Sequence, residues 1–332
     1  MRTLADLEIG CAANGVTHHD TDIPDIDTKF RWVREAGVFD YIDRSPPDEE
    51  FAAVLKAAER HGLPVRAGTG QYVMGRDEAH FERHIIKARL LGARVHNLQL
   101  LAHHADGHPL SDAEVAEFYL RAQDFGLRHG VAPCFEVHVD MWSEHFGRIE
   151  QVAALVEARG VALRLTLDAS HVVFKVDNPV QQAAQGLAAD VASGRLVIDP
   201  RLPGHVIGRW VTAHRVLHAH ARGAVPANPL NTRAHHPDGR PGRGIQYPFI
   251  RPRPGEYVTD DWQESRLEPW KQVMRDLLQH HAREEASPLG GISCEYIPFT
   301  DYGAGHGYSL FEQNVACAQW LRQAWQQALA QG

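Results

Sequence analysis

The sequence contains only four cysteines among its 332 residues, and no two of them form a CxxC pair. This spacing indicates neither a zinc ribbon nor a disulfide framework, so we expect the cysteines to be buried as small apolar residues. The chain also lacks any run of about 18 apolar residues, the length that a membrane span needs. Its first residues show no signal-peptide pattern, and we therefore predict a cytoplasmic protein without a membrane partner.

Positive charge is scarce relative to negative charge, since the net charge is -8 with histidine neutral. A broad nucleic-acid surface requires the opposite balance, so no nucleic-acid partner is expected. The sequence has no glycine-rich phosphate motif. It also has no internal repeat, low-complexity tract or domain linker. Histidine is plentiful, with 22 residues, but this number alone is weak evidence for a metal.

Strand-like and helix-like segments alternate regularly along the chain, and this alternation is typical of a parallel sheet with helical crossovers. Eight such units in a chain of this length predict a closed (β/α)8 TIM barrel that forms a single domain over residues 1–332. The predicted strands cover residues 7–13, 39–43, 64–68, 95–101, 133–139, 162–168, 216–220 and 292–297. The predicted helices cover residues 28–36, 48–61, 77–91, 112–129, 144–159, 178–193, 262–284 and 309–330.

The predicted strands have one apolar and one polar side, unlike the strands of an ordinary parallel sheet. In the sixth strand Leu165 and Leu167 share one side, whereas Thr166 and Asp168 share the other. In a barrel the leucines would pack on the helices and the polar side chains would point inward. Because buried polar groups need partners, this pattern favours a metal or a ligand inside the rim.

One segment, residues 221–261, interrupts the alternation between the seventh strand and its helix, where short connections are usual. It is rich in proline, glycine and arginine. Loops of this length are usually functional or disordered, so we predict a lid, a substrate-contact loop or a contact within a homo-oligomer. The alternative is a solvated excursion. The arginines of this loop also raise the option of an acidic or phosphorylated substrate.

Four acidic or histidine residues stand at the ends of predicted strands: Glu136, Asp168, His220 and Glu295. By parity each lies on the polar side of its strand, near the carboxyl end, where barrel enzymes build their active sites. Three converging carboxylates would repel one another, and a divalent cation removes that repulsion. We therefore predict one metal ion, Mn²⁺ in the first place, with Mg²⁺, Co²⁺ or Zn²⁺ as alternatives. The choice between His220 and His218 as ligand stays open, although His220 lies nearer the rim.

A second set of residues lies near these ligands and is predicted to contact the substrate. His171, three positions after Asp168, can reach a substrate oxygen, and His138, two positions after Glu136, can act as a supporting or acid/base group. An arginine suits a planar anion, a tryptophan offers an apolar wall to a sugar ring, and loop residues at this end often line the pocket. The predicted substrate contacts are His171, Arg222, His138, Trp142 and Asn14.

This pattern resembles the xylose isomerase-like barrel superfamily, particularly the sugar isomerase/epimerase branch with its tagatose epimerase-like and hydroxypyruvate isomerase-like enzymes. In that branch the site consists of a Glu on strand five, an Asp on strand six followed three residues later by a His, a His or Gln on strand seven in an H-x-[HQ] context, and a Glu on strand eight. The matching positions are Glu136, Asp168 with His171, His220 and Glu295. The resemblance implies one divalent metal and catalysis at a carbon beside a carbonyl. The HAHARG segment lacks the acidic residue common in that branch, which leaves the substrate open.

The predicted function is that of a divalent-metal-dependent isomerase or epimerase acting on a small sugar or sugar derivative. Proton transfer would proceed through a metal-stabilised enediolate, with Glu136 and Glu295 as proton-transfer groups and His171 steadying a substrate oxygen. A leaving group beside the carbanion would make the same site a lyase or dehydratase that acts on a keto-sugar or cyclitol by β-elimination. This is the nearest alternative.

Two more distant alternatives remain. An endonuclease IV-like phosphodiester hydrolase shares this barrel but needs three zinc ions and further histidines, and the third predicted strand has none. A non-catalytic binding protein is the other alternative because a fold does not determine a function, although all four predicted ligands are present.

Overall fold

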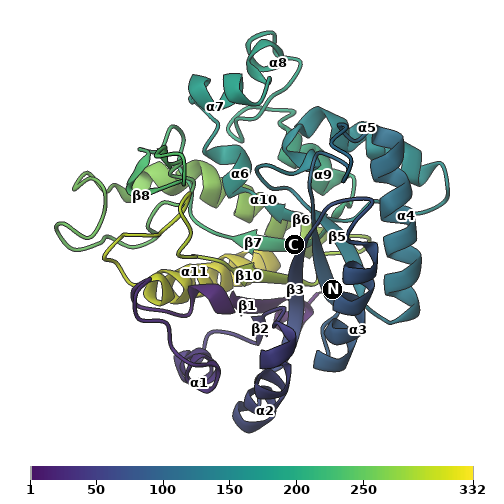
Figure 1. Ribbon diagram of the computed structural model, residues 1–332. Coiled ribbons are helices and arrows are strands. Elements are labelled where there is room, and N and C mark those ends of the chain that lie inside the picture. Colours follow the sequence, from purple (N-terminus) through teal and green to yellow (C-terminus); the bar gives the residue numbers. More distant parts are fainter. Residues whose placement is uncertain (1, 332) are drawn as a thin grey trace.

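The computed structural model describes residues 2–331 and contains a closed barrel of eight parallel strands (Figure 1). The strands are β1 (Glu8–Ala12), β2 (Tyr41–Asp43), β3 (Val65–Tyr72), β4 (Val95–Leu100), β5 (Ala132–Glu136), β6 (Leu165–Asp168), β7 (Val216–Ala221) and β10 (Gly291–Cys294). Each strand pairs with the barrel strand that precedes it in the chain, and β10 pairs with β1 to close the ring. The predicted (β/α)8 barrel is confirmed.

The helices are α1 (Ile26–Ala36), α2 (Phe51–His61), α3 (Glu78–Leu91), α4 (Asp112–Arg128), α5 (Phe146–Glu157), α6 (Ser170–Val173), α7 (Pro179–Ala184), α8 (Ala188–Ala192), α9 (Val206–Thr212), α10 (Glu268–Arg283) and α11 (Leu310–Gln331). The long helices surround the barrel strands and cover their outer, apolar sides, whereas the short helices α7 and α8 project away from the barrel and have no buried residue (Figure 1). The predicted start of α4 is confirmed, because the Ser111 side chain accepts a hydrogen bond from the backbone N–H of Glu114 in a capping box.

The connection between β6 and β7 differs from the prediction of one helix over residues 178–193. Asn178 caps α7 and Pro179 follows at its first position, which is a favourable start for a helix. Gly186 then adopts a left-handed conformation with φ of 66°, which ends α7, and the chain resumes as α8. The short helices α6 and α9 were not predicted, because at four and seven residues they offer too short a pattern to stand out in the sequence.

The two sides of the barrel strands have the polarity that was predicted. Leu165 and Leu167 are fully buried in the apolar core between the strands and the helices. On the opposite side, Thr166 donates a hydrogen bond to the amide oxygen of Asn97 inside the barrel. The interior therefore holds a hydrogen-bonded polar network, whereas the helix-facing side holds the apolar core.

The insertion at residues 221–261 contains a small antiparallel hairpin of β8 (Asn231–His235) and β9 (Pro241–Gly242), and β8 is labelled in Figure 1. Arg243 fastens the insertion to neighbouring loops, because its Nη2 lies 2.9 Å from Oδ2 of Asp301 and 2.7 Å from Oδ2 of Asp140. Ile245 joins a small apolar cluster with Tyr302 and other rim residues. The insertion is therefore packed on the rim and is not a solvated excursion. Its role as a lid or an oligomer contact stays a prediction.

All four cysteines are buried and unpaired with one another, as expected. Between residues 2 and 331, no helix has both the length and the apolar character required to cross a membrane.

Candidate metal centre and substrate cavity

The four predicted metal ligands lie together at the carboxyl ends of their strands. Glu136 and Asp168 are the last residues of β5 and β6, His220 is the penultimate residue of β7, and Glu295 directly follows β10. One potential ligand atom from each residue lies within 4.8 Å of the others. No distance can be read from a sequence, yet the alternation of side chains along each strand correctly predicted that these four residues share one rim.

His220 lies between two of the carboxylates. Its Nδ1 atom is 2.9 Å from Oε1 of Glu136 and 3.1 Å from Oε2 of Glu295. Burial alone would lower the pKa of His220, but Glu295 and then Glu136 outweigh burial and raise that pKa well above its ordinary value. Gln99 also donates a hydrogen bond of 2.9 Å to the other oxygen of Glu136, which fixes this carboxylate.

Arg222 is the second cation of the centre, and its side chain is fully buried. Its guanidinium donates to Oδ2 of Asp168 and lies 3.3 Å from Oε2 of Glu295. Burial alone would raise the pKa of Asp168, but Arg222 and then His171 hold it well below its usual range. Arg222 therefore balances part of the negative charge from within the protein.

The donor set of this centre fits a divalent metal ion. Three carboxylates and one imidazole match the ligands of Mn²⁺, Mg²⁺, Co²⁺ and Zn²⁺, and the distances among their ligand atoms suit a single ion. The backbone N–H of Ser170 donates to Oδ1 of Asp168 at 2.9 Å and so orients this carboxylate. Such support for a ligand is common at metal sites. The residues that would hold the ion are Glu136, Asp168, His220 and Glu295.

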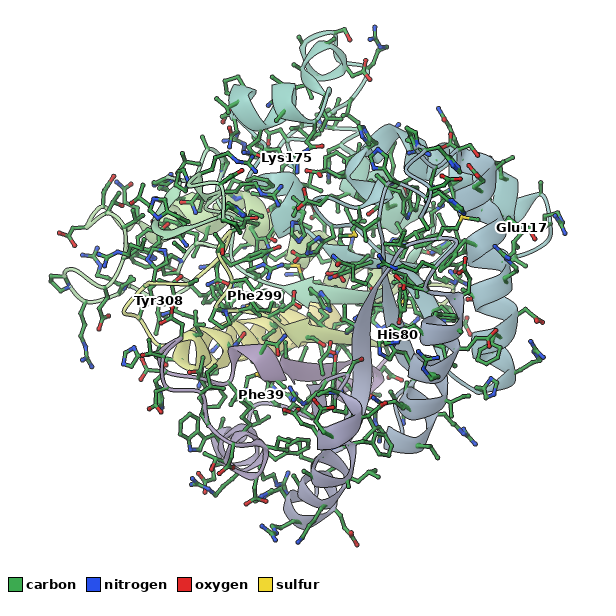
Figure 2. The ribbon with its side chains drawn as sticks, viewed as in Figure 1. Phe39, His80, Glu117, Lys175, Phe299 and Tyr308 are labelled. Carbon is green, nitrogen blue, oxygen red and sulfur yellow. The ribbon has the colours of Figure 1, made fainter. Side chains whose placement is uncertain are left out.

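A cavity of about 360 Å³ opens beside the centre, a size that suits a small molecule. Of the four predicted ligands, only Glu295 lines it, and 15% of the Glu295 side chain is exposed. The predicted substrate contacts Asn14 and His138 also line this cavity. Its apolar wall comes from the segment after β10, where Phe299, labelled in Figure 2, is 52% exposed.

His171 and His138 stack with ring centroids 4.1 Å apart. Burial lowers the pKa of each to about 4, so both rings are neutral near pH 7. Nε2 of His171 lies 3.2 Å from Oδ2 of Asp168, and Nε2 of His138 lies 3.2 Å from the hydroxyl of Tyr302. His138 thus separates His171 from the cavity, so contact of His171 with a substrate would be indirect in this arrangement.

Two further predicted substrate contacts, besides His171, do not reach the cavity. The guanidinium of Arg222 is covered by the ring of Tyr302, with 4.2 Å between the guanidinium carbon and the ring centroid. Trp142 is fully buried and packs edge-on against Phe135 at a centroid distance of 4.9 Å. This position indicates a core residue, and it does not favour Trp142 as a wall for a sugar ring.

Two arginines of the insertion bind other groups of the protein. Arg243 pairs with two aspartates, and Arg233 donates to the backbone oxygens of Gly255 and Tyr257. Within the described residues, the cavity has one arginine in its lining, Arg44, which follows β2. Arg233 and Arg243 therefore give no support to an acidic or phosphorylated substrate, and Arg251 and Arg253 line a different cavity.

Sequence reasoning missed Asp43, the last residue of β2, which is buried and lines the cavity. It was detectable, because Asp43 closes the predicted strand 39–43 in the same way as Asp168 closes the sixth strand. Phe299 and Tyr302 were missed as well. No local signal marks them, since they lie in a loop whose path over the rim depends on tertiary contacts.

The chain therefore has the architecture of a closed parallel barrel protein whose rim carries a candidate metal centre of three carboxylates and one imidazole. No family model matches the sequence, and no curated protein matches it. Solved structures that share the predicted barrel fold include xylose isomerase-like TIM barrel proteins.

Three of these structures illustrate the range of the group. A xylose isomerase-like TIM barrel protein from Mycobacterium smegmatis in complex with magnesium is 15% identical, with coverage of 99% of this chain and 100% of that chain and a TM-score of 0.52. D-allulose 3-epimerase from Methylomonas sp. is 13% identical, with coverage of 98% and 100% and a TM-score of 0.52. A probable 3-DHS dehydratase from Bacillus anthracis is 10% identical, with coverage of 93% and 98% and a TM-score of 0.53. At these identities the similarity shows the fold alone.

Proposed function

We propose that the protein is a divalent-metal-dependent isomerase or epimerase of a small sugar or sugar derivative. The observation that carries this proposal is the convergence of Glu136, Asp168, His220 and Glu295 beside a cavity of about 360 Å³. The epimerase and the magnesium complex among the structural neighbours agree with this reaction class and with a divalent ion. We propose Mn²⁺ as the ion, with Mg²⁺, Co²⁺ and Zn²⁺ as alternatives.

The four ligands have unequal access to a substrate. Glu295 reaches the cavity, whereas Glu136 is fully buried and held by Gln99 and His220. A divalent ion at this centre would supply Lewis acidity toward a substrate carbonyl. Glu295 is then the group that removes a proton from the carbon beside that carbonyl, which leaves an enediolate. We propose Glu136 as the second proton-transfer group, because it lies beside Glu295 at the same nitrogen of His220.

The two stacked histidines support this chemistry from the wall of the cavity. His138 lines the cavity and is neutral near pH 7, so it can donate a hydrogen bond to a substrate oxygen or accept one from it. His171 contacts Asp168 and His138, and in the present geometry it acts on a substrate oxygen through His138. The polar residues Asn14, Gln71 and Gln99 offer further partners for hydroxyl groups, as a sugar requires.

The second candidate function is a lyase or dehydratase that uses the same residues. If the carbanion next to the carbonyl carries a leaving group on the adjacent carbon, proton removal by Glu295 is followed by loss of that group. The dehydratase among the structural neighbours favours keeping this candidate. The two functions differ in their product, because elimination yields a conjugated double bond that absorbs ultraviolet light and epimerisation does not.

Exchange of substrate hydrogen with solvent deuterium tests the proposal directly. The wild-type protein, loaded with Mn²⁺, is incubated in deuterated water with D-fructose, D-tagatose or L-ribulose, and deuterium uptake is followed by mass spectrometry. Glu295→Gln should reduce the exchange rate by about 10² to 10⁴, which is the usual contribution of a general acid–base group. The exposed Glu285→Gln serves as the matched control and should retain the wild-type rate.

Full exchange in Glu295→Gln would refute the role of this carboxylate. Absence of exchange with every ketose, together with a rise in ultraviolet absorbance on cyclic hydroxy-ketones, would favour the lyase. Three expectations from the sequence stay predictions: the cytoplasmic location, the single domain over residues 1–332, and the homo-oligomer.

A further inference from the structure

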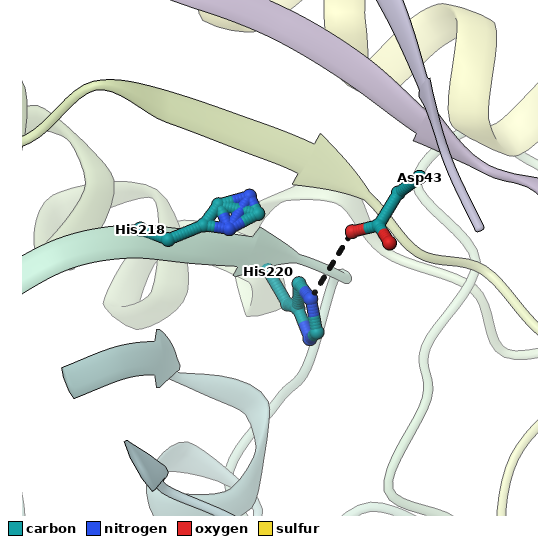
Figure 3. A group of neighbouring side chains, drawn as sticks. All are labelled: Asp43, His218 and His220. Atoms are coloured by element: carbon teal, nitrogen blue, oxygen red, sulfur yellow. Dashed lines mark ion pairs between the residues drawn. The ribbon is translucent and has the colours of Figure 1, made fainter. Parts of the chain in front are cut away.

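Asp43 on β2 faces His220 on β7, with β1 and β10 between these two strands in the ring. Its Oδ2 atom lies 3.6 Å from Nε2 of His220, an ion-pair contact slightly longer than a hydrogen bond, and Figure 3 shows the carboxylate directed toward the ring. The hydroxyl of Ser293 donates a hydrogen bond of 2.7 Å to the same oxygen. Only 6% of Asp43 is exposed, so this carboxylate is held in place.

The two ring nitrogens of His220 therefore face different groups. Nδ1 points toward Glu136 and Glu295, where the candidate metal ligands converge, and Nε2 points toward Asp43. An imidazole binds a metal through a nitrogen without a proton and keeps its proton on the other nitrogen. A carboxylate that accepts this second N–H fixes both the protonation pattern and the orientation of the ring.

We propose that Asp43 is a positioning residue that keeps the proton of His220 on Nε2, so that Nδ1 presents its lone pair to a divalent ion. The inference rests on the proposed function, because it assigns Asp43 a task in the same metal centre. It also explains a carboxylate that is not one of the four ligands and yet stands at the edge of the same cavity.

Asn97 has the opposite effect on the same nitrogen. Its amide nitrogen lies 3.1 Å from Nε2 of His220 and can donate a hydrogen bond to it only when Nε2 carries no proton. In that form the ring proton resides on Nδ1, facing Glu136 at 2.9 Å, and the lone pair needed for a metal is absent. Asp43 and Asn97 thus compete for Nε2, and only Asp43 favours the metal-binding form of the ring.

The same residues do not indicate a second metal site around Asp43. His218 lies near both Asp43 and His220, as Figure 3 shows, and the three offer ligand atoms within 4.8 Å of one another. However, Nε2 of His218 is already 3.2 Å from the Tyr41 hydroxyl and 3.1 Å from the Ser293 hydroxyl. These hydroxyl groups build a hydrogen-bonded support under Asp43, which fits a positioning role.

The binding of Mn²⁺ to the metal-free protein tests this inference without any substrate. Isothermal titration calorimetry gives the Kd of Mn²⁺, and the visible spectrum of the Co²⁺ form reports its coordination. Asp43→Asn replaces the acceptor by an amide that can donate to Nε2, so the Kd should rise about 10- to 100-fold, the usual cost of losing such a partner. Asn97→Ala removes the competitor and should leave the Kd unchanged or lower it.

Several controls make the outcomes distinct. The exposed Asp48→Asn should bind Mn²⁺ as the wild type does. Urea denaturation of each metal-free variant shows whether it folds. If Asp43→Asn fails to fold, Ser293→Ala, which loosens Asp43 and keeps its charge, takes its place and should raise the Kd by a smaller factor. An unchanged Kd in the tested variant would overturn the inference.

Two further results separate this inference from the proposed function. Failure of the wild-type protein to bind Mn²⁺ or Co²⁺ would overturn both. Normal binding by the wild type, with Asn97→Ala weakened as much as Asp43→Asn, would overturn only the role of Asp43, because Asn97 would then be the residue that holds the ring.

Discussion

His218 and His220 are two residues apart on the same inward side of β7, and both are buried. Their ring centroids are only 5.4 Å apart. His218 is deeper in the barrel, where its Nε2 contacts the hydroxyls of Tyr41 and Ser293. His220 is nearer the rim and contacts carboxylates. One strand thus places a histidine in each of two layers of the barrel interior. The deeper layer, around His218, is lined by hydroxyl groups, and the rim layer, around His220, is lined by carboxylates.

The two layers give the histidines opposite acid–base properties. Burial, and then the charge of His220, lowers the pKa of His218 to about 3. The pKa of His220 is raised despite equal burial, because Glu295 and Glu136 stabilise its charged form. Burial alone therefore does not identify a functional histidine. The sign of the neighbouring charge does, and it favours His220 over His218 as the metal ligand.

The rim layer also contains positively charged side chains that balance the charge of its carboxylates. Arg222 is buried against Asp168 and Glu295, and these two carboxylates raise its pKa although burial alone would lower it. Together with His220 it gives the carboxylates cationic partners within the chain. A buried charge without a partner is strongly destabilising, so these cationic partners reduce the free-energy cost of burying the carboxylates.

The largest expected difference between the two histidines is in metal binding. His220→Ala removes a direct ligand without offering the amide oxygen of a Gln, so it should cost more than the loss of a supporting residue and raise the Kd of Mn²⁺ by over ~100-fold. His218→Ala removes a ring that contacts hydroxyl groups and should leave about one ion bound. Plasma mass spectrometry of metal per chain after dialysis checks both. Equal loss of metal in the two variants would contradict this difference and would indicate that both histidines of β7 bind the metal.

The next difference is in the pH dependence of stability of the metal-free protein. His218 has a folded-state pKa of about 3 against 6.5 in the unfolded chain, so its contribution is complete above pH 6.5 and is lost as the pH falls toward 3. His220 has a raised folded-state pKa, so its contribution is complete below pH 6.5 and is lost as the pH rises through that pKa.

Urea denaturation across pH should therefore separate the two variants. His218→Gln should reduce the acid loss of stability, and His220→Gln should reduce the alkaline loss. Each change in slope is at most about 1.4 kcal/mol per pH unit, the value for one proton. The acid slope should persist in part in His218→Gln, because His138 and His171 also have lowered pKa values. The same slope change in both variants would contradict the assigned layers.

The barrel and its four rim ligands could be predicted because they follow from strict local rules. Successive side chains of a strand point to opposite sides, so Thr166 and Asp168 had to face the interior if Leu165 and Leu167 faced the helices. Parallel strands in a closed barrel also bring their carboxyl ends to one rim, so Glu136 and Glu295 lie close together there although they are 159 positions apart along the chain.

The remaining features depend on tertiary contacts that no local pattern encodes. Arg222 follows the HxH run and was predicted to meet a substrate, but Tyr302 covers it and Asp168 holds it. Trp142 was predicted to form a cavity wall, but it packs on Phe135. In each case the residue type favoured a contact with the substrate, but contacts with other parts of the protein determine where the side chain points.

The smallest expected effect concerns the deeper layer alone. Tyr41 packs its ring directly over Gly10, where a Cβ atom would lie 2.1 Å from the ring, and its hydroxyl contacts His218 at 3.2 Å and Ser293 at 2.9 Å. Tyr41→Phe keeps the ring and removes only these hydrogen bonds, so unfolding in urea should cost about 0.5–1.5 kcal/mol less free energy. The Kd of Mn²⁺ should not change, because Ser293 still holds Asp43. Weaker Mn²⁺ binding in this variant would show that the deeper layer also supports the metal centre, and that the two histidines act as one unit.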